Sequence, residues 1–455
     1  MFVPLRCNWP GRESCPPSIT MGTPTTIRII GLMAGMAAGA SGHAGAAMFS
    51  FGPGEVPSGY AQVLPETRYS AAQGYGFEEG SAVTAVDRGG PDPLRSHFCT
   101  ADHPFYFSVG VPEGNYTVTV VLGDLEGEST TTIKSEIRRL QVEEQHTAPG
   151  QFSARRFVVN VRTPNFAPGG IVRLKPREKT GEFWDWDEKL TLEFSGERPC
   201  VCAVLVFPAP DAPTLYLAGD STVCDQPYEP FNSWGQMLPR FFGPGVAVAN
   251  HAESGESLQS FVSEKRLAKL DTLMRSGDFL FIQFGHNDQK EKGEGVGAFT
   301  TYKADLERYV ADARAHGATP VLVTPVSRRT FGADGKITNS LGDYPEAVRR
   351  VAKEQGVALI DLNAMSKTLY EALGPERATE LFPTINGKVE GTHHDNYGSY
   401  ELAKCIVGGI KANRLAVADC LLGDTPPFDP AHPDPLARFA VPPSPRQSKQ
   451  VPYGN

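Results

Sequence analysis

Residues 215–222 read Leu-Tyr-Leu-Ala-Gly-Asp-Ser-Thr and decide how the second half of the chain is interpreted. The apolar run predicts a buried strand, and the polar residues after it predict a turn that leaves Ser221 exposed at the carboxyl end of that strand. In open α/β sheets, reactive groups collect outside the strand ends, where a following helix N-terminus offers N–H groups to negative charge. Ser221 is therefore a candidate nucleophile, although a strand ending in Gly-Asp-Ser is more often a simple turn with a helix cap.

The stretch belongs to a segment, residues 213–420, in which strand-like and helical runs alternate. This order predicts a parallel sheet with helices on both faces, the arrangement of the α/β class. Strands are predicted at residues 215–218, 245–249, 279–284, 320–324 and 357–360, and helices at residues 299–316, 344–354 and 397–412.

The segments on either side have a different character. Residues 48–208 contain short runs in which apolar and polar residues alternate, separated by turn signals, which predicts an all-β sandwich. Residues 208–213, Pro-Ala-Pro-Asp-Ala-Pro, predict a stiff linker. Residues 421–455 contain nine prolines, so we expect an extended strap over the surface or partial disorder.

Residues 1–47 are typical of a targeting segment. A positive charge, a short apolar stretch and the Ala-Gly-Ala pattern at residues 44–46 follow Met21, so translation is predicted to begin there. The stretch is too short and too rich in glycine for a stable membrane span. We therefore expect a protein that is secreted or located in the periplasm.

Composition excludes several partners and leaves others open. The formal charge is -9, and no basic cluster interrupts it, which argues against nucleic acid or an anionic membrane as a partner. Six cysteines follow residue 47, and their disulfide pairing is not readable, with Cys405 and Cys420 only a guess. No CxxC or HExxH motif appears, so no metal and no cofactor are predicted. Oligomeric state is not readable either.

Ser221 needs a general base, and His393 in the polar stretch of residues 390–398 is the best candidate. A base of this kind is oriented through its second ring nitrogen, and Glu390, three residues earlier, can reach that nitrogen on a tight loop. Gly255 follows the second strand, and its backbone N–H could approach the serine closely. Asn287 follows the third strand and could add its side-chain amide to an oxyanion hole.

Four blocks, at residues 219–222, 253–257, 285–288 and 390–393, occur in an order and spacing that resemble the SGNH (GDSL-type) hydrolases, and the rhamnogalacturonan acetylesterases in particular. The resemblance implies a flavodoxin-like α/β/α fold and a serine esterase without a metal. It also implies that the N-terminal half is a jelly-roll-like, galactose-binding-like module. Ser221, Gly255 and Asn287 would form the oxyanion hole, and the substrate would be an acetylated plant cell-wall polysaccharide, pectin above all.

The chain departs from the family pattern at one position, because Glu390 stands where an aspartate is usual. The additional methylene displaces the carboxylate by roughly 1.5 Å unless the loop compensates. Asp395 and Asp361 are therefore kept as alternative acids.

Other choices stay open. His394 is an alternative base to His393. His286 and Asp220 are candidate substrate contacts, although His286 could equally well fix its loop and Asp220 is expected mainly to hydrogen-bond local backbone N–H groups. Trp184 and Trp186 could bind sugar in the N-terminal module, although two tryptophans two residues apart on a strand more often fill a core or a domain interface. Alternative activities are an acetylxylan esterase, a lipase or thioesterase of the same superfamily, and a carbohydrate-binding protein without catalysis.

Overall fold

The computed structural model describes residues 46–453. The targeting segment predicted over residues 1–47 lies almost entirely outside this range and remains a prediction. None of the helices within residues 46–453 is both long and apolar enough to span a bilayer.

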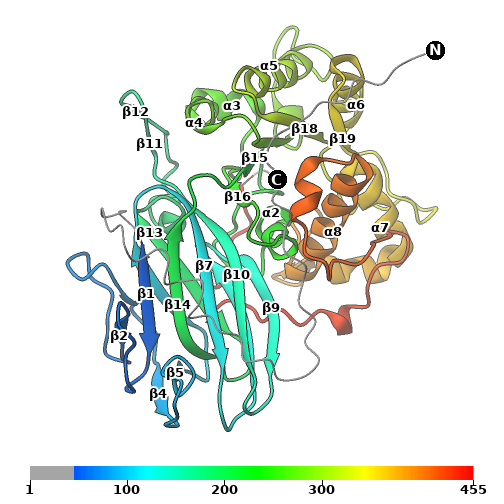
Figure 1. Cartoon of the computed structure of the whole chain (residues 1–455). Helices are drawn as coiled ribbons and strands as arrows, with labels where there is room; N and C mark the ends of the chain where they lie inside the picture. The colour runs from blue at the N-terminus through cyan, green and yellow to red at the C-terminus, as the bar shows by residue number, and fades with distance from the viewer. Residues whose placement is uncertain (1–45, 454–455) are drawn as a thin grey trace, which may run out of the picture. The chain divides into compact units, whose positions relative to one another are not determined.

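The N-terminal module is a sandwich of two sheets with a shared apolar core (Figure 1). One sheet has the order β3-β6-β13-β8-β9, and the other contains β10-β7-β14-β1-β2, with β5 paired to β14 and β4 paired to β5. In β7 buried and less buried residues alternate, as the sequence predicts for a strand with one face on the core. The strands are β1 (Ala47–Phe51), β2 (Ala61–Val63), β3 (Tyr75–Phe77), β4 (Thr84–Asp87), β5 (His97–Thr100), β6 (Phe105–Gly110), β7 (Gly114–Gly123), β8 (Ser129–Ser135), β9 (Arg139–Thr147), β10 (Phe152–Val161), β11 (Asn165–Phe166), β12 (Gly170–Ile171), β13 (Lys189–Ser195) and β14 (Cys200–Pro208).

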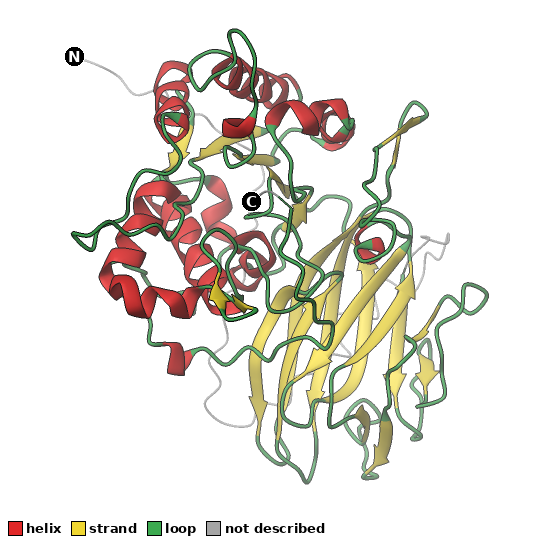
Figure 2. Cartoon of the chain, turned by 180° about the vertical axis from the view of Figure 1, so that it is seen from behind, coloured by secondary structure: helices red, strands yellow, loops and turns green. Residues whose placement is uncertain are grey.

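The second half is a parallel sheet with helices on both faces (Figure 2). Numbered from one to five along the chain, its strands have the order 2-1-3-4-5, which is the flavodoxin-like arrangement. Leu215 and Leu217 point to the core under α2, α7 and α8, whereas Tyr216 and Ala218 point to the core under α3, α4, α5 and α6. The fold class predicted from sequence is confirmed. The elements are β15 (Thr214–Gly219), β16 (Ala247–Asn250), β17 (Phe279–Gln283), β18 (Thr319–Val323), β19 (Ala358–Ile360), α2 (Trp234–Met237), α3 (Leu258–Ser263), α4 (Arg266–Leu273), α5 (Thr301–Ala315), α6 (Tyr344–Gln355), α7 (Leu362–Arg377) and α8 (Asn396–Ala412).

The sheets of the two halves are continuous. Strand β10 of the N-terminal module pairs in parallel with β16 at Val159 and Val248, which joins both halves in one twelve-stranded sheet. The proline-rich segment runs from the end of β14 to the start of β15, where the Asn115 side chain donates a hydrogen bond to Thr214 Oγ1 (2.8 Å). The connection is thus held against the sheet by a polar side chain of the module.

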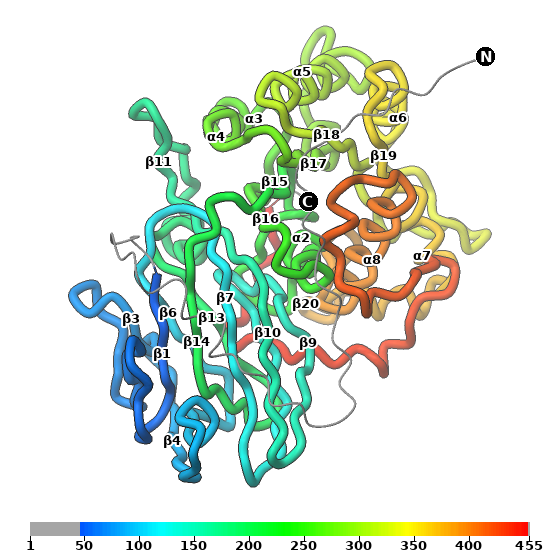
Figure 3. The backbone as a smooth tube through the Cα atoms, viewed as in Figure 1, coloured from blue at the N-terminus to red at the C-terminus, as the bar shows by residue number. Residues whose placement is uncertain are grey.

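The strap, residues 421–453, follows α8 and leads back to the N-terminal module (Figure 3, red). Its one regular element among the described residues is a short 3-10 helix at Leu436–Arg438. Further along, Ser444 is buried and its hydroxyl donates to the carboxylate of Glu193 on β13 (2.8 Å). Lys134 on β8 donates to the Ser444 hydroxyl (2.8 Å), so this part of the strap is anchored to the module.

The buried cysteines of residues 46–453 contribute apolar volume rather than cross-links. Five of them are buried thiols without a disulfide, and Cys405 is among these, so the guessed bond between Cys405 and Cys420 is wrong. The five are Cys99, Cys200, Cys202, Cys224 and Cys405.

Candidate active site

The structure places Ser221 next to His393 and buries both residues, so the exposure predicted for Ser221 at the strand end is wrong. Ser221 lies in the turn after β15, which Asp220 fixes by accepting hydrogen bonds from the backbone N–H (2.9 Å) and the hydroxyl (2.7 Å) of Thr222. The Ser221 Oγ lies 2.8 Å from His393 Nε2, although the two residues are 172 positions apart in the chain. A hydroxyl at this distance can donate its proton to a neutral imidazole, as a serine nucleophile requires.

Glu390 lies behind the imidazole, but not in ideal hydrogen-bonding geometry. Its Oε1 is 3.7 Å from His393 Nδ1, which is longer than a hydrogen bond. Its Oε2 accepts the backbone N–H groups of Thr392 and His393, both at 2.5 Å. The carboxylate thus shapes the loop that carries the histidine and also places negative charge near its ring.

The two alternative acids are engaged elsewhere. Asp395 caps α8 and accepts the backbone N–H of Gly398 at 2.8 Å. Asp361 caps α7 and forms an ion pair with Arg349 at 2.9 Å. Glu390 is therefore the carboxylate that the structure brings to the candidate base.

His394 points away from the serine and into the core. Its Nε2 lies 2.6 Å from the hydroxyl of Tyr370, and its ring packs on Phe382 with centroids 4.4 Å apart. Burial lowers the pKa of His394 to about 3, so its ring is neutral at ordinary pH. This histidine is positioned to support the loop, and His393 is the one aligned with Ser221.

Residues 253–257, here called the oxyanion loop, run close to the nucleophile. Gln226 joins the two segments, because its side-chain amide donates to Ser221 O (2.8 Å) and to Ser254 Oγ (3.2 Å). Gly255 has a φ of +81°, which favours glycine. Among the described residues, no protein acceptor takes the backbone N–H of Ser221 or of Gly255.

Asn287 and His286 lie in the loop after β17. The Asn287 amide donates to Glu256 O in the oxyanion loop (2.9 Å), which leaves its second N–H available. His286 Nδ1 lies 3.3 Å from Asp220 Oδ2, and burial lowers the pKa of His286. His286 Nε2 is buried and has no hydrogen-bond partner within the described part of the chain.

Comparisons with known proteins agree with this geometry. Residues 217–384 match the GDSL-like lipase/acylhydrolase family, and residues 47–138 match the galactose-binding-domain-like family of β-agarase and YXIM esterase-like proteins. The rhamnogalacturonan acetylesterase RhgT of Bacillus subtilis is 42% identical over 219 residues, which are 46% of this chain and 94% of RhgT.

This chain is an SGNH hydrolase of the rhamnogalacturonan acetylesterase family. It is a serine esterase with a YxiM-like N-terminal module. The uncharacterized esterase YxiM of Bacillus subtilis is 27% identical and matches 81% of this chain and 91% of its own. A crystal structure of YxiM from Bacillus subtilis shares 26% identity and a TM-score of 0.44, with 82% of this chain and 99% of that one covered.

In this member of the family the N-terminal module reaches into the catalytic half through Arg138. Its buried guanidinium donates to the carbonyl oxygens of Gln226 (3.0 Å) and Phe231 (2.7 Å) in the segment after Ser221. It also donates to Asn396 Oδ1 (3.0 Å) at the start of α8, just beyond the histidine, and pairs with Glu229 at 2.6 Å. One arginine therefore links the segments that carry the serine and the histidine.

A second contact holds the oxyanion loop. Arg177 Nε donates to Glu253 Oε1 (2.7 Å), and its terminal nitrogen contacts Ser254 O. Lys175 donates to the same carbonyl (2.8 Å) and pairs with Glu256. These partners could not be predicted from the local sequence, because Arg177 and Lys175 are about 80 residues away from the loop they hold.

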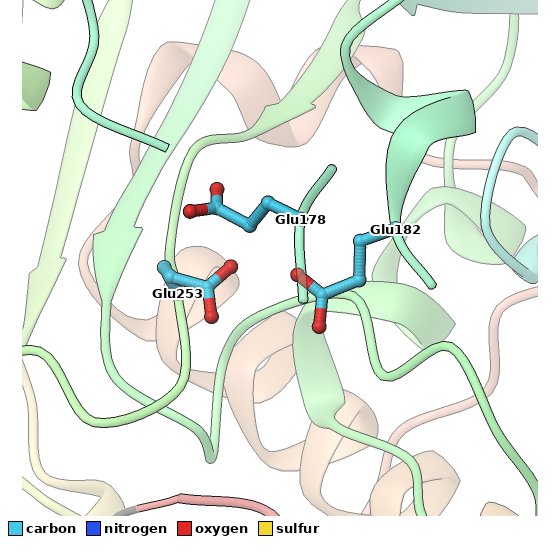
Figure 4. A group of neighbouring side chains, drawn as sticks. All are labelled: Glu178, Glu182 and Glu253. Carbon is cyan, nitrogen blue, oxygen red and sulfur yellow. The ribbon is translucent and has the colours of Figure 1, made fainter. Parts of the chain in front are cut away.

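Three buried glutamates come together at this loop (Figure 4). Glu253 belongs to the loop, and Glu178 and Glu182 belong to the N-terminal module. Their carboxylate oxygens lie within 4.8 Å of one another, a spacing that would suit a cation. Arg266 makes a bidentate contact with Glu178 (2.6 and 3.0 Å), and Arg177 pairs with both Glu182 and Glu253. We interpret the cluster as a structural ion network, since each carboxylate already pairs with one of two guanidinium groups and burial raises the pKa of Glu182, which favours its neutral form.

The tryptophans of the module have different surroundings. Trp186 is buried, and the guanidinium of Arg162 lies 4.6 Å from its ring centroid. Trp184 is partly buried between Tyr106 and Arg446 of the strap. Trp186 is therefore buried where the two halves meet, since its ring also lies against that of His251 with centroids 6.2 Å apart. Trp184 lies in the 3-10 helix Phe183–Asp185 and Trp186 follows it, so the strand expected at the two tryptophans is not formed.

Proposed function

We propose that this acetylesterase, which acts on carbohydrate acetyl groups, has acetylated rhamnogalacturonan in pectin as its substrate and works outside the cytoplasm. The observation that carries the catalytic part is the 2.8 Å contact between Ser221 Oγ and His393 Nε2 beside the oxyanion loop. The substrate is proposed from RhgT, whose name states that activity.

We propose the following roles in the reaction. Ser221 Oγ attacks the acetyl carbonyl carbon, and His393 Nε2 takes the hydroxyl proton while Glu390 favours the resulting imidazolium. The N–H groups of Ser221 and Gly255 and the amide of Asn287 bind the oxyanion. His393 returns the proton to the departing sugar oxygen, then removes a proton from water, which attacks the acetyl-enzyme and releases acetate.

The test measures acetate released from acetylated rhamnogalacturonan and from acetylated xylan. Ser221→Ala is the catalytic variant, and Ser340→Ala, an exposed serine, is the matched control. Release from rhamnogalacturonan that Ser221→Ala loses and Ser340→Ala keeps supports the proposal. If acetate is released from xylan alone, the proposed substrate is wrong and acetylated xylan takes its place. If folded protein releases acetate from neither polysaccharide, the carbohydrate-binding alternative is favoured.

A further inference from the structure

The strap reaches the oxyanion loop after crossing the module. A Cβ built on Gly255 would lie 3.3 Å from the Cβ of Tyr453 and 3.8 Å from Lys175 Nζ. Tyr453 therefore lies beside the residue whose N–H is proposed to bind the oxyanion. Its side chain belongs to the edge of the candidate active site, although the catalytic blocks lie about 60 residues and more before it in the chain.

Several contacts fix the position of this tyrosine. The guanidinium of Arg177 lies 4.7 Å from its ring centroid and is itself held by Glu253. Earlier in the strap, Arg446 O accepts the backbone N–H of Glu229 (2.8 Å), and Ser448 N donates to Glu229 O (2.9 Å). The strap thus pairs with the segment after the nucleophile before it reaches the oxyanion loop.

The ring of Tyr453 is held on one side and open on the other. Arg177 covers one face, yet 59% of the residue is exposed, the largest exposure among the exposed large apolar and aromatic residues that the structure describes. Its hydroxyl makes no hydrogen bond to any described residue. A tyrosine with only a packing role is normally buried with its hydroxyl bonded, so another role is indicated.

We propose that Tyr453 is a sugar-binding platform, whose open face stacks on a pyranose ring of the polysaccharide next to the acetylated residue. The inference rests on the proposed function and specifies how the chain of sugars is held. An aromatic face packs well against the C–H groups of a pyranose ring, and a ring fixed beforehand loses little conformational entropy on binding. Because the platform adjoins Gly255, a sugar bound there is a neighbour of the reacting ester.

The test compares two substrates in Tyr453→Ala and Tyr453→Trp. We measure kcat/KM for acetylated rhamnogalacturonan oligosaccharides and for nitrophenyl acetate, which has no second sugar, and take their ratio. Tyr453→Ala is expected to lower this ratio about five- to tenfold through KM of the oligosaccharide, the size of one aromatic contact. Tyr453→Trp is expected to keep or raise it.

Phe299→Ala is the matched control. Phe299 is also exposed (36%) and also lies beneath a guanidinium, that of Arg350 at 4.4 Å, but it contacts α6 instead of the oxyanion loop. The ratio is expected to stay constant in this variant. An unchanged ratio in folded Tyr453→Ala, or an equal loss on both substrates, overturns the platform. Ser221→Ala tests the catalytic proposal separately, because it removes activity on both substrates whatever Tyr453 does.

Discussion

Glu390 illustrates how a single methylene changes a catalytic position. The family usually has aspartate there, and the longer side chain places one oxygen 3.7 Å from His393 Nδ1 and the other on two backbone N–H groups. An electrostatic contribution at this distance is weaker than that of a hydrogen-bonded carboxylate. We therefore expect Glu390 to combine its structural role in the loop with a weaker electrostatic effect on His393.

Glu390→Gln is expected to lower kcat/KM on nitrophenyl acetate between about 10- and 1000-fold, less than the roughly 10⁴-fold loss seen when a hydrogen-bonded triad acid is neutralised. The amide keeps an acceptor for the loop and removes the charge. Glu376→Gln, an exposed glutamate on α7, is the control. A loss below about threefold in the Glu390 variant, judged against this control, would show that the carboxylate plays no part in catalysis.

Asn287→Ala is expected to lower kcat about 100- to 1000-fold with the fold retained, because one oxyanion donor is removed. The control is Asn413→Ala, since Asn413 also donates its amide to a backbone carbonyl, that of Leu359 (2.8 Å), at the far end of α8. Steady-state kinetics and thermal unfolding of both variants distinguish the two sites. Equal kcat in the two variants would remove Asn287 from the oxyanion hole.

Among the elements, α7 and α8 begin with aspartates that have opposite titration behaviour. Burial raises the pKa of Asp395, the cap of α8, to about 7. Burial also acts on Asp361, the cap of α7, but its hydrogen bond and charge interaction with Arg349 prevail and hold its pKa below the usual value. Two helix caps of the same residue type therefore affect stability differently as pH changes.

Asp395→Asn is expected to flatten the pH dependence of stability. The folded protein binds the Asp395 proton more tightly than the unfolded chain, so the free energy of unfolding falls as pH rises from about 4 to about 7. The variant, which keeps a capping group, should gain melting temperature relative to wild type between pH 5 and pH 8. Asp361→Asn should lower the melting temperature by the same amount at pH 5 and at pH 8. The pKa of Asp361 is depressed, so its charged carboxylate stabilises the folded protein throughout that range. If the melting temperature of Asp395→Asn differs from that of wild type by the same amount at every pH, the raised pKa of Asp395 is contradicted.

The connection between β8 and β9 carries Arg138, and we expect it to position the catalytic segments. Arg138→Lys keeps the charge but cannot bond Gln226, Phe231 and Asn396 together, so kcat on nitrophenyl acetate should fall about tenfold. Arg88→Lys is the matched change, since Arg88 pairs with Asp124 inside the module. If both variants keep wild-type kcat, the link through Arg138 is dispensable.

At the scale of the molecule, the N-terminal module is joined to the catalytic half by a shared sheet and by buried ion pairs. RhgT matches 46% of this chain and 94% of its own length, so in that relative the catalytic fold stands without such a module. Here, Asp225, Glu229 and Glu253 are buried and have their arginine partners, Arg139, Arg138 and Arg177, in the module. Removing the module would leave these carboxylates without counter-charges.

We expect residues 212–455 alone to be unstable, because each buried carboxylate left unpaired costs about 3 to 5 kcal/mol. In this fragment, the changes Asp225→Asn, Glu229→Gln and Glu253→Gln together should restore part of the lost melting temperature. The measurement is thermal unfolding of the original and the neutralised fragments beside the full chain. A fragment that melts with the full chain would show that the two halves are energetically independent.

The sequence predicted the strands of the α/β half because buried parallel strands are short apolar runs, and β15 differs from its predicted range by one residue at each end. It did not predict α7, whose periodic pattern is interrupted by Gly374 and Pro375. Ser221, His393 and Asn287 were predictable because they end strands or precede the last helix. Arg138 and the pairing of β10 with β16 were not, since their contacts span 88 residues or more of intervening chain.

The exposed stretch of the strap has a consequence for proteolysis. Most of residues 422–439 are exposed or partly exposed and form little regular structure, the features that proteases favour. A single cut there would leave residues 442–453, and Tyr453 with them, held only by non-covalent contacts while Ser221 and His393 stay intact. Once that fragment dissociates, the preference for polymers over small esters should fall by the same factor of about five to ten that is expected for Tyr453→Ala.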